Sequence, residues 1–352
     1  MSSTLRFGLG LGFGLFVCFA PPLALPDSAS AQNYGYQSAN PRAVQERRDR
    51  EAAQRGAVIV NQPHGPTEAL RQARAMTSTL NRLKPERKGV VDVYVVAIGL
   101  DSDGVFGRET AETARVLASR YDAEGRVVVM ANGKGAAGAP TDPVVPEGSP
   151  EHLAQALGHV AEVMNKQEDV LALFITTHGH WNTGLNYRDG ERAGGNIAPS
   201  RLAALLNEVG IKNRLVILSA CYSGIFIPAL QNETTITLTA ASAEKPSFGC
   251  RAENDWTFFG DALVNQALRQ PVPLPDAFAQ ARAMITKWEV AARLDPSSPQ
   301  IDLGPQAIAW MDKIDAKVPK LAGQPKGMPA YGAPPPPAPI ERPKPVPFLS
   351  KP

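Results

Sequence analysis

Short hydrophobic runs rich in β-branched residues alternate with amphipathic helical segments between about residues 90 and 310. The runs are continuous rather than alternating, which is typical of strands buried on both faces. They predict strands at 91–98, 127–129, 170–175, 215–218 and 235–238. The segments between them predict helices at 110–121, 149–165 and 199–209. Because strand and helix alternate, we expect an α/β fold in which helices flank a mainly parallel sheet.

The first residues resemble an export signal. Arg6 precedes an apolar stretch at 7–25, and an A-x-A pattern occupies 29–31. A membrane anchor is the alternative, but the stretch is rich in glycine and broken by Pro21-Pro22. We therefore expect a signal peptide at 1–31, cleavage after Ala31 and a periplasmic or secreted product. No later segment is long and apolar enough to span a bilayer.

The composition shifts divide the remaining chain into three predicted parts. Residues 32–88 are expected to form a polar N-terminal extension with a charge-dense helix at 42–56. The main domain is expected at 89–312. Residues 313–352 are expected to form a disordered proline-rich tail. A docking ligand for a proline-binding module is the other interpretation of that tail.

Charge and cysteine content exclude several functions. The chain has 36 Lys and Arg against 34 Asp and Glu, a net charge of +2. That balance provides no strong field for a nucleic-acid backbone or an anionic membrane. The chain has 3 cysteines, too few for a disulfide scaffold or a four-cysteine zinc site. Cys221 and Cys250 remain after removal of the predicted signal peptide, so a single catalytic thiol is possible.

Two of the predicted strands end in residues that carry chemistry. The third is followed by Thr-Thr-His178-Gly179-His, and the fourth by Ser-Ala-Cys221-Tyr-Ser-Gly224. Ligands and catalytic groups gather beyond the carboxyl ends of parallel strands. If these strands are neighbours, an imidazole can take the proton of the thiol, as nucleophilic thiol catalysis requires. The N–H groups of Gly179 and Cys221 could face an oxyanion, and Gly179 and Gly224 leave room for a peptide backbone.

Each of these residues also has an interpretation without catalysis. A cysteine after an apolar strand is commonly a buried small hydrophobe, and a lone histidine is commonly structural. His178 and His180 could form a metal pair, but His64, His152 and His159 offer no recognisable ligand spacing. We therefore predict no metal. No glycine-rich phosphate loop and no G-x-S-x-G motif is present, so no cofactor is predicted.

The runs TTHGH, SACYSG and SFGCRAENDWTFFGDAL resemble the bacterial branch of the legumain (asparaginyl endopeptidase) family, from about residue 91 to residue 289. Members of this family are cysteine peptidases with a caspase-like fold. The resemblance implies a three-layer sandwich and peptide or protein substrates. It also implies His178 as the base and Cys221 as the nucleophile.

The resemblance extends in part to substrate specificity. The family's preference for Asn or Asp implies substrate-binding roles for Arg108, Asp255 and Ser247, and a guanidinium fork suits an amide oxygen or a carboxylate. Ser219 stands where legumains of higher organisms carry Glu, and we expect it also to line the pocket. Thr177 replaces an Asp before the histidine. We find no Asn at the place where some members orient the His.

Two functions from different classes follow. The first is an exported cysteine endopeptidase that acts by acyl transfer, and an amine in place of water would make it a transamidase with the same residues. The second is a non-catalytic exported binding protein on the same fold, whose tail docks a partner. An oxidising compartment would favour a Cys221–Cys250 disulfide, which removes the nucleophile and supports this second function.

Overall fold

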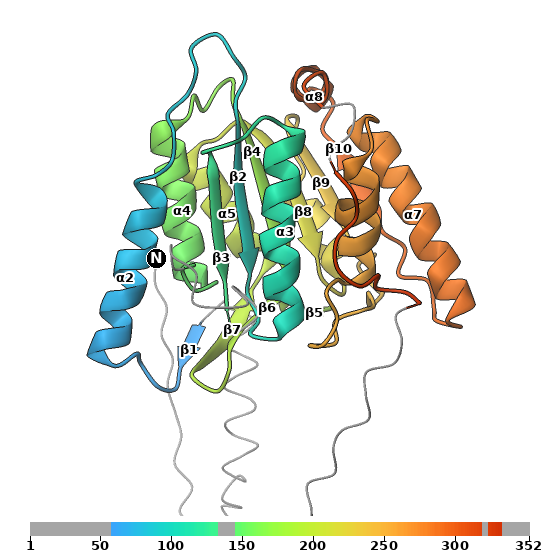
Figure 1. Cartoon of the computed structure of the whole chain (residues 1–352), viewed down its shortest axis with the longest axis horizontal. Coiled ribbons are helices and arrows are strands. Elements are labelled where there is room, and N and C mark those ends of the chain that lie inside the picture. The colour runs from blue at the N-terminus through green and yellow to red at the C-terminus, as the bar shows by residue number, and fades with distance from the viewer. Residues whose placement is uncertain (1–57, 133–144, 319–322, 333–352) are drawn as a thin grey trace, which may run out of the picture. The chain divides into compact units, whose positions relative to one another are not determined.

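A six-stranded sheet forms the centre of the protein (Figure 1). The computed structural model describes residues 58–132, 145–318 and 323–332; the signal peptide predicted at 1–31, the helix predicted at 42–56 and the tail beyond 332 lie outside them. The strand order is β10-β9-β8-β4-β2-β3, and all neighbours are parallel except β10 and β9. The strands are β2 (Val93–Gly99), β3 (Val127–Ala131), β4 (Val170–Thr176), β8 (Asn213–Ser219), β9 (Thr235–Thr239) and β10 (Gln300–Leu303).

Helices cover both faces of this sheet. Successive residues of β2 point to opposite faces: Val93, Val95 and Ala97 contribute to one hydrophobic core, and the residues between them to the other. One layer contains α3 (Gly104–Arg120), the π-helical segment η3 (Gly260–Gln266), η4 (Ala267–Arg269), α7 (Leu274–Ala291) and α8 (Ala307–Asp315). The other contains α2 (Pro66–Leu80), α4 (Pro150–Val163), α5 (Pro199–Val209), η2 (Ser223–Phe226) and α6 (Ile227–Leu230). Among the described residues, no helix has the length and apolarity needed to cross a membrane.

The predicted three-layer α/β sandwich is therefore confirmed. All five strands expected from the sequence are present, and α4 and α5 lie where helices were predicted. The helix predicted at 110–121 differs, because α3 already begins at Gly104. Val105 and Phe106 are fully buried in its first turn. This early start places the N-terminus of α3 directly beyond the carboxyl end of β2.

A second, antiparallel sheet has the order β1-β7-β6-β5. Its strands are β1 (Val58–Val60), β5 (Gly179–His180), β6 (Gly184–Asp189) and β7 (Ala193–Ile197). β1 pairs with β7, and Met76 of α2 is buried in the core beside α4. The prediction of an N-terminal extension up to residue 88 is thus wrong for 58–88, since backbone pairing and apolar burial join these residues to the main domain.

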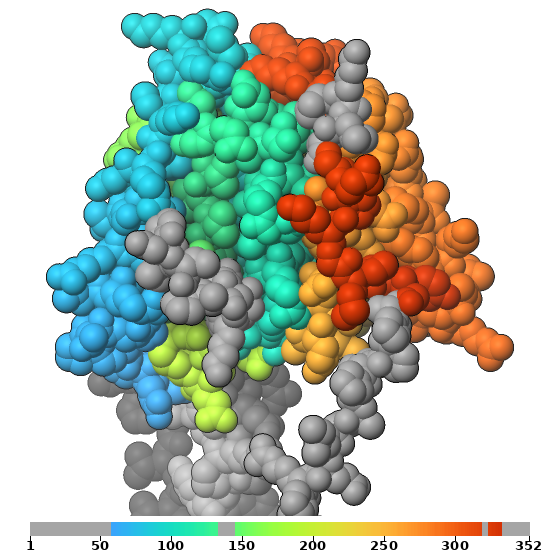
Figure 2. Space-filling model, viewed as in Figure 1, coloured from blue at the N-terminus to red at the C-terminus, as the bar shows by residue number. Residues whose placement is uncertain are grey.

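The predicted disordered tail also needs correction. α8 already includes residues 313–315, and residues 323–332 form an extended segment that we call the strap. The N–H of Ala330 donates to Asp261 Oδ2 (2.8 Å), and the ring of Tyr331 stacks on Trp288 with centroids 6.3 Å apart. In Figure 2 the strap, in red, lies over the orange helical region. Proline content excludes helix and strand here, but it does not exclude docking through backbone donors and an aromatic ring.

Candidate active site

The predicted dyad lies at the ends of two adjacent strands. β4 and β8 are parallel neighbours with Thr176 opposite Ser219, and His178 and Cys221 each follow two residues later. The two chain segments stay close beyond the strand ends: the backbone of Gly179 lies so near that of Cys221 that an added Cβ would be only 2.0 Å from the Cys221 carbonyl oxygen. The structure therefore brings the predicted base and nucleophile to one place at the carboxyl edge of the sheet.

The two glycines beside the dyad have a different role from the one predicted. We expected Gly179 and Gly224 to leave room for a substrate backbone. Instead, each accommodates the chain itself: Gly179 lies against the backbone of Cys221, and Gly224 lies against Ala243, whose nitrogen would be 2.5 Å from an added Cβ. Tyr222 follows the nucleophile with a φ of 57°, a left-handed conformation that is costly for a bulky residue. The turn after Cys221 is thus tightly constrained.

Ser247 contacts the sulfur of Cys221 through its backbone and its side chain. Its N–H and its hydroxyl both donate to Cys221 Sγ, at 3.2 and 3.6 Å. A hydrogen bond from the Cys250 thiol is the largest cause that lowers the pKa of Cys221, to about 6; Ser247 and the charge of His178 add to it, and burial opposes it. The thiolate is the form that attacks carbonyl carbon. The environment of Cys221 therefore favours the reactive form near neutral pH.

Cys250 is the second thiol of the site. Both cysteines are free in the structure. The hydrogen bond to Cys221 and burial raise the pKa of Cys250 well above the usual value for a thiol, and the nearby Glu109 adds to the effect. The two shifts run in opposite directions, so Cys221 ionises before Cys250.

His178 has a carboxylate partner that we did not predict. Its Nε2 lies 3.2 Å from Asp103 Oδ2, and its ring meets the edge of Phe106 at a centroid distance of 4.9 Å. Arg188 of β6 pairs with Asp103 Oδ1 at 2.7 Å and with both oxygens of the buried Asp101 at 2.7 and 2.9 Å. The antiparallel sheet thereby contributes a cation that holds the carboxylate beside the histidine.

The charge state of Asp103 follows from these contacts. Burial alone would raise the pKa of Asp103, but hydrogen bonds from His178 and Arg188 outweigh it and lower the pKa. Asp103 is therefore an ionised acceptor at neutral pH. One sequence signal pointed to it, because Asp103 lies in the segment after the first predicted strand, at the edge where catalytic groups gather. The residue types alone did not reveal the link to Arg188.

Two residues predicted to bind substrate are engaged with each other. Arg108 Nε lies 3.2 Å from Asp255 Oδ1, and its guanidinium also donates to the carbonyl oxygens of Ala252 and Asn254. The second oxygen of Asp255 accepts the N–H of Met328 in the strap at 2.7 Å. Arg108 therefore supports the loop before Trp256, and the side chains expected to bind Asn or Asp have partners within the chain.

Ser219 lies behind the nucleophile rather than on the substrate surface. Its side chain is buried, at 2% exposure, and its Oγ lies 3.1 Å from Thr257 Oγ1. The Thr257 N–H in turn donates to the fully buried Glu109 at 2.8 Å. Burial raises the pKa of Glu109, and the hydrogen bond from Thr257 offsets this only in part. The predicted substrate contact of Ser219 is thus corrected, because the hydroxyl is enclosed.

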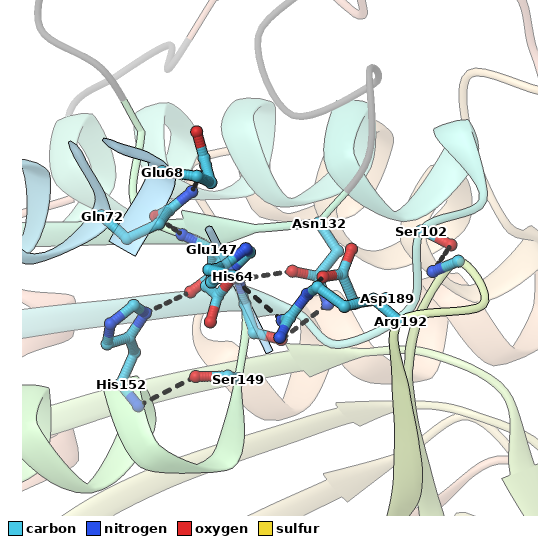
Figure 3. A network of polar contacts seen from close by, with 12 residues as sticks. His64, Glu68, Gln72, Ser102, Asn132, Glu147, Ser149, His152, Asp189 and Arg192 are labelled. Carbon is cyan, nitrogen blue, oxygen red and sulfur yellow. Dashed lines mark hydrogen bonds and ion pairs between the residues drawn. The ribbon is translucent and has the colours of Figure 1, made fainter. Parts of the chain in front are cut away.

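Two clusters of possible metal ligands occur among the described residues: His64, Glu147 and Asp189, and Asp101, Asp103 and His178. In Figure 3 the first cluster gathers around Arg192, which pairs with Glu147 at 3.2 Å and with Asp189. Arg188 occupies the corresponding place in the second. An arginine already balances the carboxylates of each cluster. His180, the other proposed ligand, hydrogen-bonds to Asn182 at 2.6 Å.

Part of the chain matches a known protein family. Residues 145–307 match the family described as the Peptidase C13 family. No curated protein matches the chain. One similar solved structure is caspase-1 from Spodoptera frugiperda, at 14% identity and a TM-score of 0.40; the alignment covers 62% of this chain and 90% of that chain.

The family match and the fold agree with the expectation from the sequence. Residues 145–307 match the Peptidase C13 family, and the predicted mainly parallel sheet flanked by helices is present. The matched segment contains His178, Cys221, Ser247 and Asp255. It begins later than the resemblance at 91–289, so it contains neither Asp103, whose contact with His178 comes from the structure, nor Arg108, whose role was implied by the resemblance.

Proposed function

We propose that the protein is an exported endopeptidase in which His178 and Cys221 form the catalytic dyad. The observation that carries this proposal is the position of both residues two places beyond the paired Thr176 and Ser219, on adjacent strands. The lowered pKa of Cys221 supports it. Export rests on the first 31 residues of the sequence, which have the pattern of a signal peptide.

The mechanism follows from the protonation states. Asp103 is ionised and only accepts, so the hydrogen between it and His178 belongs to Nε2, which leaves Nδ1 free for the thiol. Nδ1 of His178 takes the proton of the Cys221 thiol, the thiolate attacks the scissile carbonyl, and the N–H groups of Gly179 and Cys221 stabilise the oxyanion. His178 then gives its proton to the leaving amine and activates the water that releases the acyl-enzyme.

Asp103 acts through His178 and is therefore a positioning residue. A carboxylate that fixes the tautomer and the ring orientation of a catalytic histidine also stabilises the imidazolium that forms during the reaction. Arg188 keeps this carboxylate ionised and in place. The sequence offers no Asn to orient the histidine, and Asp103, the residue before α3, would take that role.

Cleavage after Asn or Asp is the substrate preference that we propose. Ser247 contacts Cys221 from the loop after β9, Asp255 lies further along that loop, and Arg108 of α3 pairs with Asp255; a substrate side chain would exchange with the contacts of Arg108 and Asp255. The lowered pKa of Cys221 supports the peptidase over the binding-protein alternative.

A direct test is the cleavage of a mixed peptide library by the wild type and by Cys221→Ala, with products identified by mass spectrometry. We expect Cys221-dependent products that end in Asn or Asp. Cleavage by a folded Cys221→Ala variant would contradict the proposal, and products with other terminal residues would contradict the specificity alone.

A further inference from the structure

The strap is held by side chains that recognise an extended backbone. Three of its N–H groups, at every second residue, donate to side-chain oxygens: Lys326 to Asn265 Oδ1 at 2.8 Å, Met328 to Asp255 Oδ2 at 2.7 Å, and Ala330 to Asp261 Oδ2 at 2.8 Å. In an extended chain every second N–H points to the same side, so the three acceptors match one edge of the strap. The docked position of the strap is therefore set by its backbone.

Asp255 is the acceptor that joins the strap to the proposed substrate site. Asn265 and Asp261 are buried, whereas the side chain of Asp255 is 29% exposed. Its Oδ1 lies 3.2 Å from Arg108 Nε, and its Oδ2 accepts the N–H of Met328. Because each oxygen has its own partner, the carboxylate cannot turn without losing a contact. The strap thereby fixes the orientation of the acidic partner of Arg108.

Gly327 allows the strap to approach this carboxylate. Its φ is 76°, and an added Cβ would lie 2.8 Å from Asp255 Oδ2. The strap is anchored elsewhere by Tyr331, whose ring stacks on Trp288 and meets the ring of Phe258 at a centroid distance of 6.2 Å. The contact with the Arg108–Asp255 pair and the aromatic anchor can therefore be disturbed separately.

We propose that the strap is a positioning element of the substrate site, which holds Asp255 against Arg108 so that this pair distinguishes an Asn side chain from an Asp side chain. The effect on cleavage rests on the proposed function. The dependence of the pair on the strap does not, because it follows from the contacts of Asp255 alone.

The chemistry of the pair gives the direction of the effect. A substrate Asn offers its amide oxygen to the Arg108 guanidinium and its NH₂ group to Asp255. A substrate Asp offers the guanidinium the same kind of acceptor, but its second oxygen meets the negative charge of Asp255, and this repulsion disfavours it. The discrimination requires a carboxylate that stays in place. Without the Met328 N–H, Asp255 is free to turn towards solvent, and the discrimination falls.

Two glycines of the strap provide matched variants. Gly327→Ala places a methyl group against Asp255, whereas Gly332, at a similar φ of 81°, has nothing within 4 Å of an added Cβ. Both variants carry the same kind of backbone strain, and only the first disturbs Asp255. Tyr331→Ala is a second route to release, because it removes the aromatic anchor and leaves Asp255 untouched. It carries the test if Gly327→Ala does not fold.

The cleavage test compares kcat/KM for two peptides that differ only in Asn or Asp at the cleaved position. We expect the wild type and Gly332→Ala to share one ratio in favour of Asn. In Gly327→Ala and Tyr331→Ala the ratio should fall about tenfold, the effect of one hydrogen bond to a charged group. A general structural loss would lower both rates equally and leave the ratio unchanged. That result, or a wild type that cleaves both peptides equally, would overturn the proposal.

A measurement without substrate separates this inference from the proposed function. The Nε–H of Arg108 donates to the carbonyl oxygen of Asn254 at 3.2 Å, and its exchange with solvent is followed by NMR after assignment with Arg108→Lys. We expect exchange at least about tenfold faster in Gly327→Ala than in the wild type and Gly332→Ala. Equal rates in all three would overturn the role of the strap, even in an active peptidase. Faster exchange in a protein that cleaves no peptide would support the positioning of Asp255 and contradict the proposed function.

Discussion

His178 Nε2 lies 3.2 Å from Asp103 Oδ2, and this contact joins the end of β4 to the first residues before α3. It fixes which ring nitrogen carries the proton. Because Arg188 holds the other oxygen of Asp103 at 2.7 Å, the carboxylate cannot turn away without losing an ion pair. The protonation and the orientation of the proposed base are therefore set by Asp103, from the segment before α3, and by Arg188 of β6.

Asp103→Asn tests this positioning role. Its amide oxygen should face Arg188, which leaves the NH₂ group towards His178 and forces the proton onto Nδ1. We expect kcat to fall about 10²-fold to 10⁴-fold with little change in KM, as expected for a wrong tautomer. The pH profile of kcat should change shape as well. Asp122→Asn, at an exposed carboxylate paired with Arg87, is the matched control and should retain wild-type kinetics. Equal kcat for both variants would reject the role of Asp103.

Gly179→Ala tests the close approach of the two strand ends. The added Cβ would lie 2.0 Å from the Cys221 carbonyl oxygen, so the chain must move. We expect the free energy of unfolding to fall by about 1–3 kcal/mol and Cys221 alkylation to slow. Gly158→Ala is the control, because nothing lies within 4 Å of its Cβ in α4. Helix propensity predicts that it gains about 0.5–1 kcal/mol. Urea denaturation of both variants measures the difference.

Glu109→Gln tests the buried carboxyl behind the nucleophile. The folded state raises the pKa of Glu109 through burial, so it favours the neutral form. The buried neutral carboxyl therefore favours the folded state fully below the unfolded pKa of about 4.5, and this part of the unfolding free energy is lost as the pH rises towards the folded pKa. Glutamine has nearly the same shape and does not ionise, so the variant does not lose stability in this way. We expect Glu109→Gln to match the wild type at pH 4 and to exceed its unfolding free energy at pH 8. Glu124→Gln, at an exposed position, should show no such divergence.

Ala330→Pro tests the docking of the strap. The substitution removes the N–H that donates to Asp261 Oδ2, whereas Ala330→Ser keeps it. We expect Ala330→Pro to lower the unfolding free energy by about 1–3 kcal/mol, because it leaves a buried carboxylate oxygen without its donor. Hydrogen exchange at Lys326 and Met328 should accelerate in the proline variant only. Equal exchange in both variants would show that the strap is not held by this contact.

The hydrophobic pattern of the sequence located the two residues of the proposed dyad, because buried parallel strands are continuous apolar runs whose ends can be recognised. His178 and Cys221 follow such ends, so the register of β4 and β8 confirms their proximity. The roles of other residues depend on partners that residue types do not reveal. The sequence suggested that the Arg108 guanidinium is available to a substrate. In the structure it donates to the carbonyl oxygens of Ala252 and Asn254, and backbone acceptors of this kind cannot be recognised from residue types.

The same limit explains the missed elements. β7 contains two consecutive glycines and has no strand-like apolar run, so its place is set by pairing with β1 and β6. The strap has a composition that excludes regular structure. It docks instead through backbone donors that meet Asp255, Asp261 and Asn265. Long-range pairing of this kind becomes visible only when the sheet and the helices are assembled.

The reactivity of the two thiols tests the central claim most directly. Alkylation of Cys221 and Cys250 by limiting iodoacetamide would be followed by peptide mapping from pH 4 to 9, in the wild type and in His178→Ala. We predict that Cys221 reacts faster than Cys250, with a midpoint near the pKa of about 6, and that the midpoint rises when His178 is lost. A Cys221 that reacts no faster than Cys250, with a pH profile that His178→Ala leaves unchanged, would contradict the dyad.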